Sequence, residues 1–397
     1  VVRANDTHYA FRPGSDFFYL TGNTEPDCVL VLEPRKKGGH RHVLFVEPNP
    51  GRSDSTFFTD RHKGELWVGP RLGIEESRER FAVDECRPLA ELDAFLKARP
   101  KKKTRAVRGL SARVDAHFKP GRARDGELAS ALSELRLIKE PGEIAELERA
   151  VAHTLVAFED VIVALRDGRT ERDVEVAFDA RARRCGNGTG YGTIAAAGKN
   201  ACILHYTKND EPLVQGELLL LDAGVEGLSL YTADVTRTLP IDGKFSPAQR
   251  EIYEIVSAAQ FAAFEAVRPG APFLAPHEAA QRVLAEGLAR LGILSNLDDA
   301  LAPDHQFQKR YTLHGTSHML GLDVHDCAAA RPEHYRMGEL RAGHVLTIEP
   351  GLYFQPDDLT VPERYRGIGI RIEDDVLVTD DGCRLLSQAI PRKADEV

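Results

Sequence analysis

The chain has 397 residues, 42% of them hydrophobic and 28% charged, which is the composition of a folded globular protein rather than a disordered one. This length exceeds what one hydrophobic core usually holds, so we expect two domains. The net charge of −9 disfavours nonspecific binding to nucleic acid, and the absence of an apolar run of about 18 residues argues against a membrane span.

Cysteine usage and the first residues bear on the compartment. Six cysteines are scattered singly along the chain without a Cys-x-x-Cys pair, which is typical of thiols in a reducing compartment. The first residues lack an initiator Met, consistent with a trimmed chain, and they lack the apolar core of a signal peptide. We therefore expect a cytoplasmic protein.

Residues 1–137 are expected to form a separate α/β domain. Residues 15–22 end at a turn glycine, and the β-rich runs 28–32 and 42–46 flank a basic, glycine-containing turn, which predicts a hairpin. The basic run Lys101–Lys103 is interpreted as a solvated loop rather than a phosphate site. The single tryptophan, Trp67, is interpreted as a packing residue that could reach a partner subunit if it were exposed.

Beyond residue 137 the pattern predicts four helices separated by strand-like segments. Each begins or ends at a recognisable signal, such as Pro141, the Thr170 capping sequence or the Ser246–Pro247 pair. In chain order the helices cover residues 141–167, 170–186, 246–268 and 277–291. The strand-like segments between them carry the polar residues that suggest a site.

Two aspartates lie within or beside apolar strands, where a carboxylate is rare without a partner or a metal. Residues 217–225 and 230–239 read as strands, and a hairpin centred on Leu228 would make Asp222 and Asp234 face each other directly. Cross-strand Cβ atoms lie roughly 4.5–5.5 Å apart, which suits two metal ions about 3.5–4 Å apart. The alternative is that Asp222 pairs with an arginine, either Arg237 or Arg371.

Three histidines and two glutamates complete the candidate set. His314, His318 and His325 fall within twelve residues, and the intervening Gly-Thr-Ser favours an extended segment over a helix. Glu349 follows an apolar strand and precedes a proline, while Glu373 ends another strand. The side chains of Asp222, Asp234, His318, Glu349 and Glu373 form an oxygen-rich set with one nitrogen, which suits Mn²⁺, Co²⁺ or Zn²⁺. We interpret these residues as a two-metal hydrolytic site.

Several motifs together resemble those of the creatinase/aminopeptidase P/prolidase group, with aminopeptidase P of the bacterial type the most similar branch. They are Leu-Asp-Ala-Gly, Asp-Val-Thr-Arg-Thr, His-Gly-Thr-Ser-His, Leu-Asp-Val-His-Asp, Glu-Pro-Gly-Leu-Tyr and Gly-Ile-Arg-Ile-Glu-Asp. The resemblance covers nearly the whole chain. It implies an α+β fold, with a pita-bread catalytic domain over residues 138–397 after a smaller creatinase-like α/β domain over residues 1–137. It also implies that this first domain controls substrate access and makes oligomer contacts.

The same resemblance implies residue roles. Asp222 would bind one metal ion, His318 and Glu349 the other, and Asp234 and Glu373 both, while a hydroxide between the ions attacks the substrate carbonyl. His205, His314 and His325 would bind the substrate and stabilise the tetrahedral intermediate, and Glu349 would transfer the proton of the water. Arg371 would lie beside the ligands, Tyr353 would line a proline pocket, and Tyr191 would support a bridging aspartate. The group usually has one residue fewer between the two aspartates, so the extra residue is predicted in the 227–231 turn or in a bulge.

The resemblance implies a cytoplasmic metallo-exopeptidase that removes the N-terminal residue from peptides with proline second. Two divalent ions, most simply Mn²⁺, and a homodimer or homotetramer are expected. A prolidase, which cleaves only Xaa-Pro dipeptides, shares the ligands and remains the alternative. A binding protein on the same scaffold is disfavoured because all five ligand positions are filled. Methionine aminopeptidase leaves the first 137 residues unexplained, and creatinase lacks the metal cluster.

Overall fold

This computed structural model describes residues 2–49, 51–100, 103–118 and 122–397, which fall into two compact units, Val1–Ala129 and Ser130–Val397. Two residues of the basic run, Lys101 and Lys102, lie outside the described residues, whereas Lys103 is exposed as expected for a solvated loop. In the part of the chain that is described, no helix is both long and apolar enough to cross a membrane.

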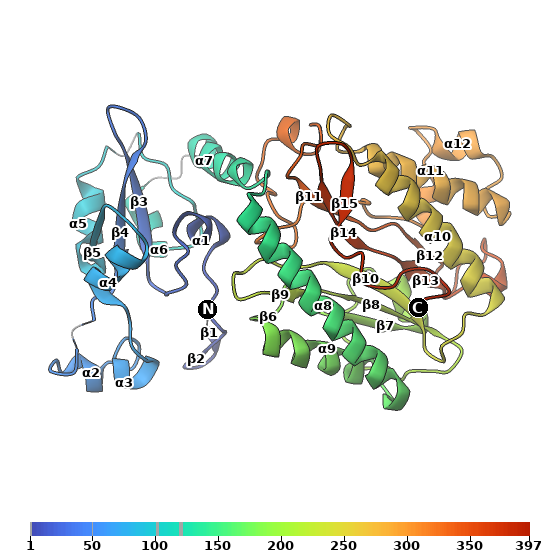
Figure 1. Cartoon of the computed structure of the whole chain (residues 1–397), viewed down its shortest axis with the longest axis horizontal. Coiled ribbons are helices and arrows are strands. Elements are labelled where there is room, and N and C mark those ends of the chain that lie inside the picture. Colours follow the sequence, from blue (N-terminus) through green and yellow to red (C-terminus); the bar gives the residue numbers. More distant parts are fainter. Residues whose placement is uncertain (1, 50, 101–102, 119–121) are drawn as a thin grey trace. The chain divides into compact units, whose positions relative to one another are not determined.

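The first unit is built on a three-stranded sheet of order β3-β4-β5 (Figure 1). β3 and β4 pair antiparallel, which confirms the predicted hairpin, and β5 pairs parallel to β4. Trp67 is 52% exposed and donates to the Phe58 carbonyl, so it is not a buried packing residue, and the alternative that it reaches a partner subunit stays a prediction. The elements are β1 Val2–Ala4, β2 Thr7–His8, α1 Ser15–Thr21, β3 Val29–Pro34, β4 His40–Val46, α2 Thr56–Thr59, α3 Glu65–Val68, α4 Gly73–Arg80, β5 Glu85–Pro88, α5 Leu92–Lys97, α6 Ala112–His117 and α7 Arg122–Leu135.

The second unit begins with two long helices that cover antiparallel strands. α8 (Pro141–Asp167) and α9 (Glu171–Cys185) each begin with a capping box, and they pack on β7 (Ile194–Ala197), β8 (Leu218–Ala223) and β10 (Val235–Pro240). Both helices end within a residue of the predicted limits. A short pair, β6 (Gly188–Thr189) and β9 (Val225–Glu226), continues this half.

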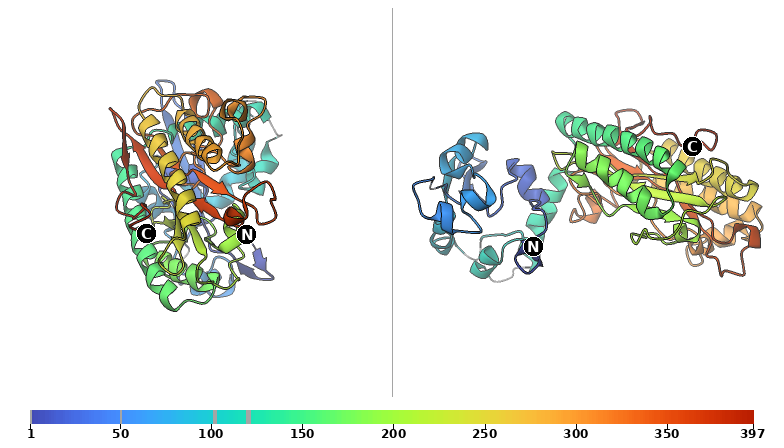
Figure 2. Two further views of the ribbon diagram at one scale, coloured as in Figure 1. Left: turned by 90° about the vertical axis from the view of Figure 1, so that its right-hand side faces the viewer. Right: turned by 90° about the horizontal axis from the view of Figure 1, so that it is seen from below.

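A second pair of helices repeats this arrangement. α10 (Pro247–Ala266) begins at the predicted Ser246 cap and packs on α11 (Ala275–Arg290), and their apolar faces share a core with the neighbouring strands. The strands are β11 (Val345–Ile348), β12 (Gly351–Tyr353), β13 (Gly369–Arg371), β14 (Asp374–Val378) and β15 (Cys383–Leu385), and α12 (Leu297–Leu301) follows α11. Figure 2 shows these helices flanking the strands from two further sides. The candidate residues lie on the strands and on the segments that join them.

The division between the units falls eight residues before the predicted boundary at Leu137. The end of α7 already belongs to the second unit, because Glu134 pairs with Arg331 and Leu137 is part of the core beneath α10. The change of pattern at Leu137 therefore marks the break between α7 and α8, and the last turns of α7 pack with the second unit.

Candidate active site

Asp222 and Asp234 lie on one face of the β8–β10 pair, but not directly opposite each other. Asp222 is opposite Thr236, two residues away from the predicted register. The predicted direct pairing was therefore wrong. Because a shift of two residues leaves every side chain on its face, the two aspartates remain diagonal neighbours. β10 begins at Val235 rather than at residue 230, since Leu230 has a φ of 66° and ends the extended backbone.

Close backbone approach sets the spacing of the two aspartates. A Cβ atom on Gly224 would lie 1.7 Å from the carbonyl oxygen of Ala233, so only glycine fits after Ala223. The pairing keeps one register from the Glu226–Thr232 bridge to the end of β10. The irregular backbone is thus confined to the 227–231 connection, and the assignment of one extra residue to that turn stays a prediction.

Tyr191 joins the two carboxylates. Its hydroxyl oxygen lies 2.7 Å from Oδ1 of Asp222 and 2.5 Å from Oδ1 of Asp234. A phenol has one proton and can donate it to only one of these carboxylates at a time. Burial and the charge of Asp222 raise the pKa of Asp234 to about 6, although the contact with His318 opposes the shift.

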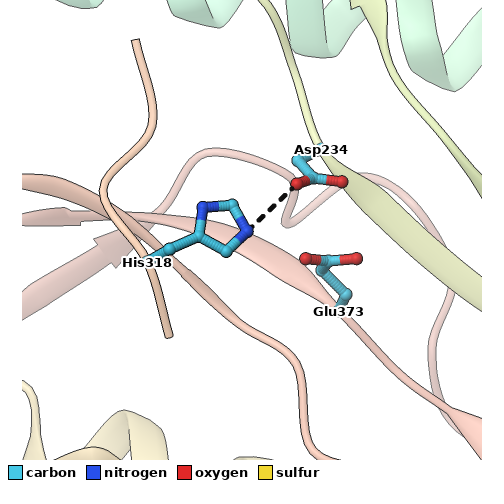
Figure 3. Close-up of side chains that lie close together, drawn as sticks. All are labelled: Asp234, His318 and Glu373. Atoms are coloured by element: carbon cyan, nitrogen blue, oxygen red, sulfur yellow. Dashed lines mark ion pairs between the residues drawn. The ribbon is translucent and has the colours of Figure 1, made fainter. Parts of the chain in front are cut away.

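The residues from His314 to His318 run extended beside β11, as predicted. The amide of Thr347 donates to the carbonyl of His318, and the amide of Glu349 donates to the carbonyl of Thr316. This register brings Nε2 of His318 to 3.4 Å from Oε1 of Glu349 and 3.3 Å from Oδ2 of Asp234. Figure 3 shows the His318 ring directed at Asp234, with Glu373 beside them.

Asp234, His318 and Glu373 offer ligand atoms that all lie within 4.8 Å of one another, as a metal ion requires. Carboxylate oxygens with one imidazole nitrogen suit Mn²⁺, Co²⁺ and Zn²⁺. Burial and the neighbouring carboxylates raise the pKa of Glu373 well above its ordinary value. Although burial opposes it, the Asp234 and Glu349 partners raise the pKa of His318 to about 9. The neighbouring carboxylates contribute to both shifts, and a bound divalent ion would offset their negative charge.

Asp222 has the arginine partner that the alternative interpretation required. The Arg371 guanidinium lies 2.5 Å from Oδ2 of Asp222, and both side chains are largely buried. Arg237 does not take this role, because it pairs at 2.8 Å with Asp374. Asp222 thus contacts Arg371 through one oxygen and Tyr191 through the other, and it stands at the edge of the three-residue group rather than inside it.

A chain of hydrogen bonds links Arg371 to Glu349. Arg371 donates to the Tyr353 hydroxyl at 2.9 Å, and Tyr353 lies 2.7 Å from Nε2 of His314. Nδ1 of His314 lies 3.3 Å from Oε2 of Glu349. If Tyr353 donates to Nε2, the ring proton sits on Nδ1, where the Gly315 carbonyl at 2.9 Å and Glu349 are the acceptors within reach. Burial opposes ionisation of Glu349, but His314, His318 and Arg371 lower its pKa to about 2, so it remains a carboxylate.

The other two predicted histidines are exposed and lie toward the rim. The His325 ring meets the His318 ring edge to face, with centroids 4.4 Å apart. Burial lowers the pKa of His325, and His318 and His205 lower it further, so His205 lies within electrostatic reach. The lowered pKa favours a neutral His325 ring, which can donate or accept a hydrogen bond.

Four residues that hold the site were not predicted in these roles. The Thr236 hydroxyl donates to Glu373 at 2.6 Å and accepts from Arg371. Asp375 accepts the amide of Asp234, and Nδ1 of His277 accepts the amide of Thr316. Arg237 donates to the Glu373 carbonyl. The signal available was the polar Thr-Arg-Thr run inside a fully buried strand.

Known proteins match the chain along its length. The "Aminopeptidase P, N-terminal domain" family model matches residues 1–107, and "Metallopeptidase family M24" matches residues 145–380. Xaa-Pro aminopeptidase 2 of Streptomyces coelicolor is 50% identical over 398 residues, which cover 100% of this chain and 84% of that protein.

Two solved structures of Escherichia coli aminopeptidase P extend the match to the fold. The zinc-substituted protein in complex with product has a TM-score of 0.87 at 36% identity, and the protein with the inhibitor Pro-Leu has a TM-score of 0.86 at 34% identity. Each alignment covers 100% of this chain and 90% of the other. These matches confirm the predicted α+β fold with its pita-bread catalytic domain. The chain therefore belongs to metallopeptidase family M24, in the group that carries the aminopeptidase P N-terminal domain.

Proposed function

We propose that this protein is an Xaa-Pro aminopeptidase, which removes the N-terminal residue from peptides with proline at the second position. The observation that carries the proposal is the convergence of Asp234, His318 and Glu373 in a buried group with histidines at its rim. Relatives that match along the whole chain bear the name of this activity, which favours it over the prolidase alternative.

We assign two divalent ions, Mn²⁺ first and Co²⁺ or Zn²⁺ otherwise, to the five predicted ligands. Asp234 and Glu373 would contact both ions, Asp222 one, and His318 with Glu349 the other. The cluster fits such ions because it has four carboxylates, and the one neighbouring guanidinium, that of Arg371, pairs with Asp222 alone. Most of the negative charge therefore remains for bound cations to neutralise. Bound divalent ions lower the pKa of water to near neutrality and polarise a peptide carbonyl.

The chain's own residues position the peptide and move the proton. Glu349, held as a carboxylate beside His314, receives the proton of the attacking water. His205, His314 and His325 hold the substrate and donate hydrogen bonds that strengthen as charge develops on the carbonyl oxygen. Arg371 fixes the Tyr353 hydroxyl, and the Tyr353 ring lines the space for proline.

A comparison of peptide lengths tests the proposal. With Mn²⁺ supplied, the tripeptide Ala-Pro-Ala should release free alanine, whereas Ala-Ala-Ala should be cleaved much more slowly. The dipeptide Ala-Pro serves as the matched control for a prolidase. A protein that cleaves Ala-Pro and leaves Ala-Pro-Ala intact is a prolidase, and one that cleaves none of the three while binding peptide is a binding protein.

Two properties of the whole protein are part of the proposal. A cytoplasmic location is supported by the six cysteines, all of which are free thiols in the structure. A homodimer or homotetramer, with the N-terminal domain controlling access, is supported by the family resemblance alone. Sedimentation velocity on the purified protein measures the oligomeric state, and a monomer at micromolar concentration would contradict the assembly.

A further inference from the structure

A fully buried ion pair lies next along the chain to His325. Nζ of Lys139 is 2.9 Å from Oδ2 of Asp326, and the two side chains are 0% and 1% exposed. The same amine donates to the carbonyl of Arg136 at 2.7 Å, and the Arg136 guanidinium lies 3.4 Å from Oδ1 of Asp326 as a second, weaker partner. The pair joins the start of the second unit to a residue 187 positions later.

Both members of this pair are fixed in place. The amide of Asp326 donates to the Met319 carbonyl, and a Cβ atom on Gly321 would lie 2.2 Å from Oδ2 of Asp326. The carboxylate is thus pressed against the backbone that follows the metal-site histidine. The amide of Lys139 donates to the Gly343 carbonyl at 2.8 Å, just before β11. Neither charged group can shift without moving these backbone segments.

His325 itself is held only through its backbone. Within residues 122–397, all of which are described, its ring makes no hydrogen bond, yet it stands edge-on to His318 with centroids 4.4 Å apart. The neighbouring residue Asp326 is therefore the point that determines where this ring can lie. A displacement of Asp326 would be passed directly to His325.

Stability alone does not account for this pair. Taking two charges out of water costs several kcal/mol for each ion, and replacing a buried pair by uncharged groups of similar shape is often neutral. We propose that Lys139 is a positioning residue of the reaction, which acts through Asp326 to hold the His325 ring beside His318. This inference rests on the proposed function, in which His325 contacts the substrate.

The first test removes both charges of the pair, and Arg136 keeps Asp323 as an ion-pair partner at 3.8 Å. In the double variant Lys139→Met with Asp326→Asn, kcat for Ala-Pro-Ala should fall about 100-fold, because misplacement of a contacting group by about 1 Å costs that much. KM and the bound-metal content should stay near wild type. Glu134→Gln is the matched control, because it removes an ion pair at the same helix end without touching Asp326. If the double variant does not fold, Lys139→Met alone makes the same test, because Asp326 keeps Arg136 as a partner at 3.4 Å.

A mutant cycle with His325→Ala separates positioning from a general loss of structure. If Lys139 acts through His325, the double variant costs little further activity once His325 is alanine, so the losses are strongly non-additive. Additive losses, unchanged kcat in the double variant, or a loss that follows the metal content would each overturn the inference.

A structural measurement keeps the inference separate from the proposed activity. In ¹³C-histidine NMR spectra of the metal-free protein, with His325 assigned from His325→Ala, its ring signal should shift in the double variant and not in Glu134→Gln. An unmoved signal contradicts the inference even if activity falls. If the wild type cleaves no peptide but the signal shifts, the proposed function fails and the Lys139–Asp326 coupling to His325 stands.

Discussion

Tyr191 and Arg371 hold Asp222 from two sides, while Asp234 and Glu373 rely on hydrogen bonds from neutral groups and from His318. The carboxylates of the site therefore differ in how much of their negative charge is already neutralised by neighbouring side chains. Among the five predicted ligands, Asp234 and Glu373 are the carboxylates whose pKa values rise, and they stand to gain most from a bound cation.

Removal of either of these charges should abolish metal binding and turnover. Asp234→Asn and Glu373→Gln keep the side-chain shape but remove a ligand charge, so we expect kcat/KM to fall by more than the 10- to 100-fold that loss of an outer partner causes. Elemental analysis should show reduced metal in both. Asp160→Asn, in an ion pair with Arg181 on the outer helices, is the control and should keep metal and activity. Full activity of a metal-free Glu373→Gln sample would contradict the proposal.

Tyr353 supplies a second prediction at this scale. Its hydroxyl connects Arg371 with His314, so Tyr353→Phe leaves both without that partner. We expect kcat for Ala-Pro-Ala to fall about 10- to 100-fold, as for other groups that orient a site, with the metal content unchanged. Steady-state kinetics and elemental analysis measure the two effects. A variant that loses metal instead would show that Tyr353 supports the ligands.

At this scale the sequence offered candidate residues for the site but not the contacts between them. Carboxylates in apolar strands are costly without partners, so Asp222, Glu349 and Glu373 could be identified from their neighbours in sequence. His277 could not, because its bond to Thr316 joins residues 39 positions apart and an isolated histidine near a helix start carries no signal. The pairing of Asp222 with Arg371 rather than Arg237 likewise depends on the packed structure.

The ends of the helices could be predicted from neighbouring residues in the sequence, whereas the pairing of the strands could not. α8, α9 and α10 begin with capping boxes, which satisfy backbone groups within a few residues and can be read directly from the sequence. The β8–β10 register could not be read in this way, because a shift of two residues preserves the face pattern. The register depends on the tight backbone contact at Gly224 and on the positive φ of Leu230. The contact joins two strands and the positive φ is an irregular backbone conformation, so neither follows from the alternation of apolar residues.

The end of α7 gives a pH-dependent prediction at the scale of elements. Arg331 donates twice to Glu134 and lowers its pKa from an ordinary 4.5 to about 2. Because the folded pKa is depressed, this contact stabilises the fold fully above about pH 4.5 and is lost as the pH falls toward 2. Glu134→Gln should cost about 1 kcal/mol of unfolding free energy at pH 7. Urea unfolding at pH 7 and pH 3 should show the difference shrinking at the lower pH, and a constant difference would contradict it.

Over the whole molecule, the two units have separate cores. Val43, Phe45 and Leu92 centre the core of the first unit, whereas the cores beneath α8 to α11 draw only on residues from Leu137 onward. The five predicted metal ligands all belong to the second unit. Composition and length predicted two domains, and the two units divide after Ala129, within α7, where the local sequence pattern does not change.

Separate cores predict that metal ions affect thermal unfolding unequally. Ions that bind only the folded second unit should stabilise it by about 2.7 kcal/mol when present at 100 times their dissociation constant. Calorimetry with Mn²⁺ and with a chelator should therefore show one transition that shifts and one that does not. In Asp234→Asn the shift should disappear. Equal shifts of both transitions would mean that the units unfold together.

The site depends on glycine at position 224. A single added methyl group would collide with the Ala233 carbonyl oxygen and would have to prise the two strand ends apart. The added methyl group would increase the distance between Asp222 and Asp234, which the Tyr191 hydroxyl now contacts together, even though residue 224 touches neither substrate nor ion. The absence of a side chain at residue 224 thus keeps the two carboxylates close enough for the Tyr191 hydroxyl to contact both.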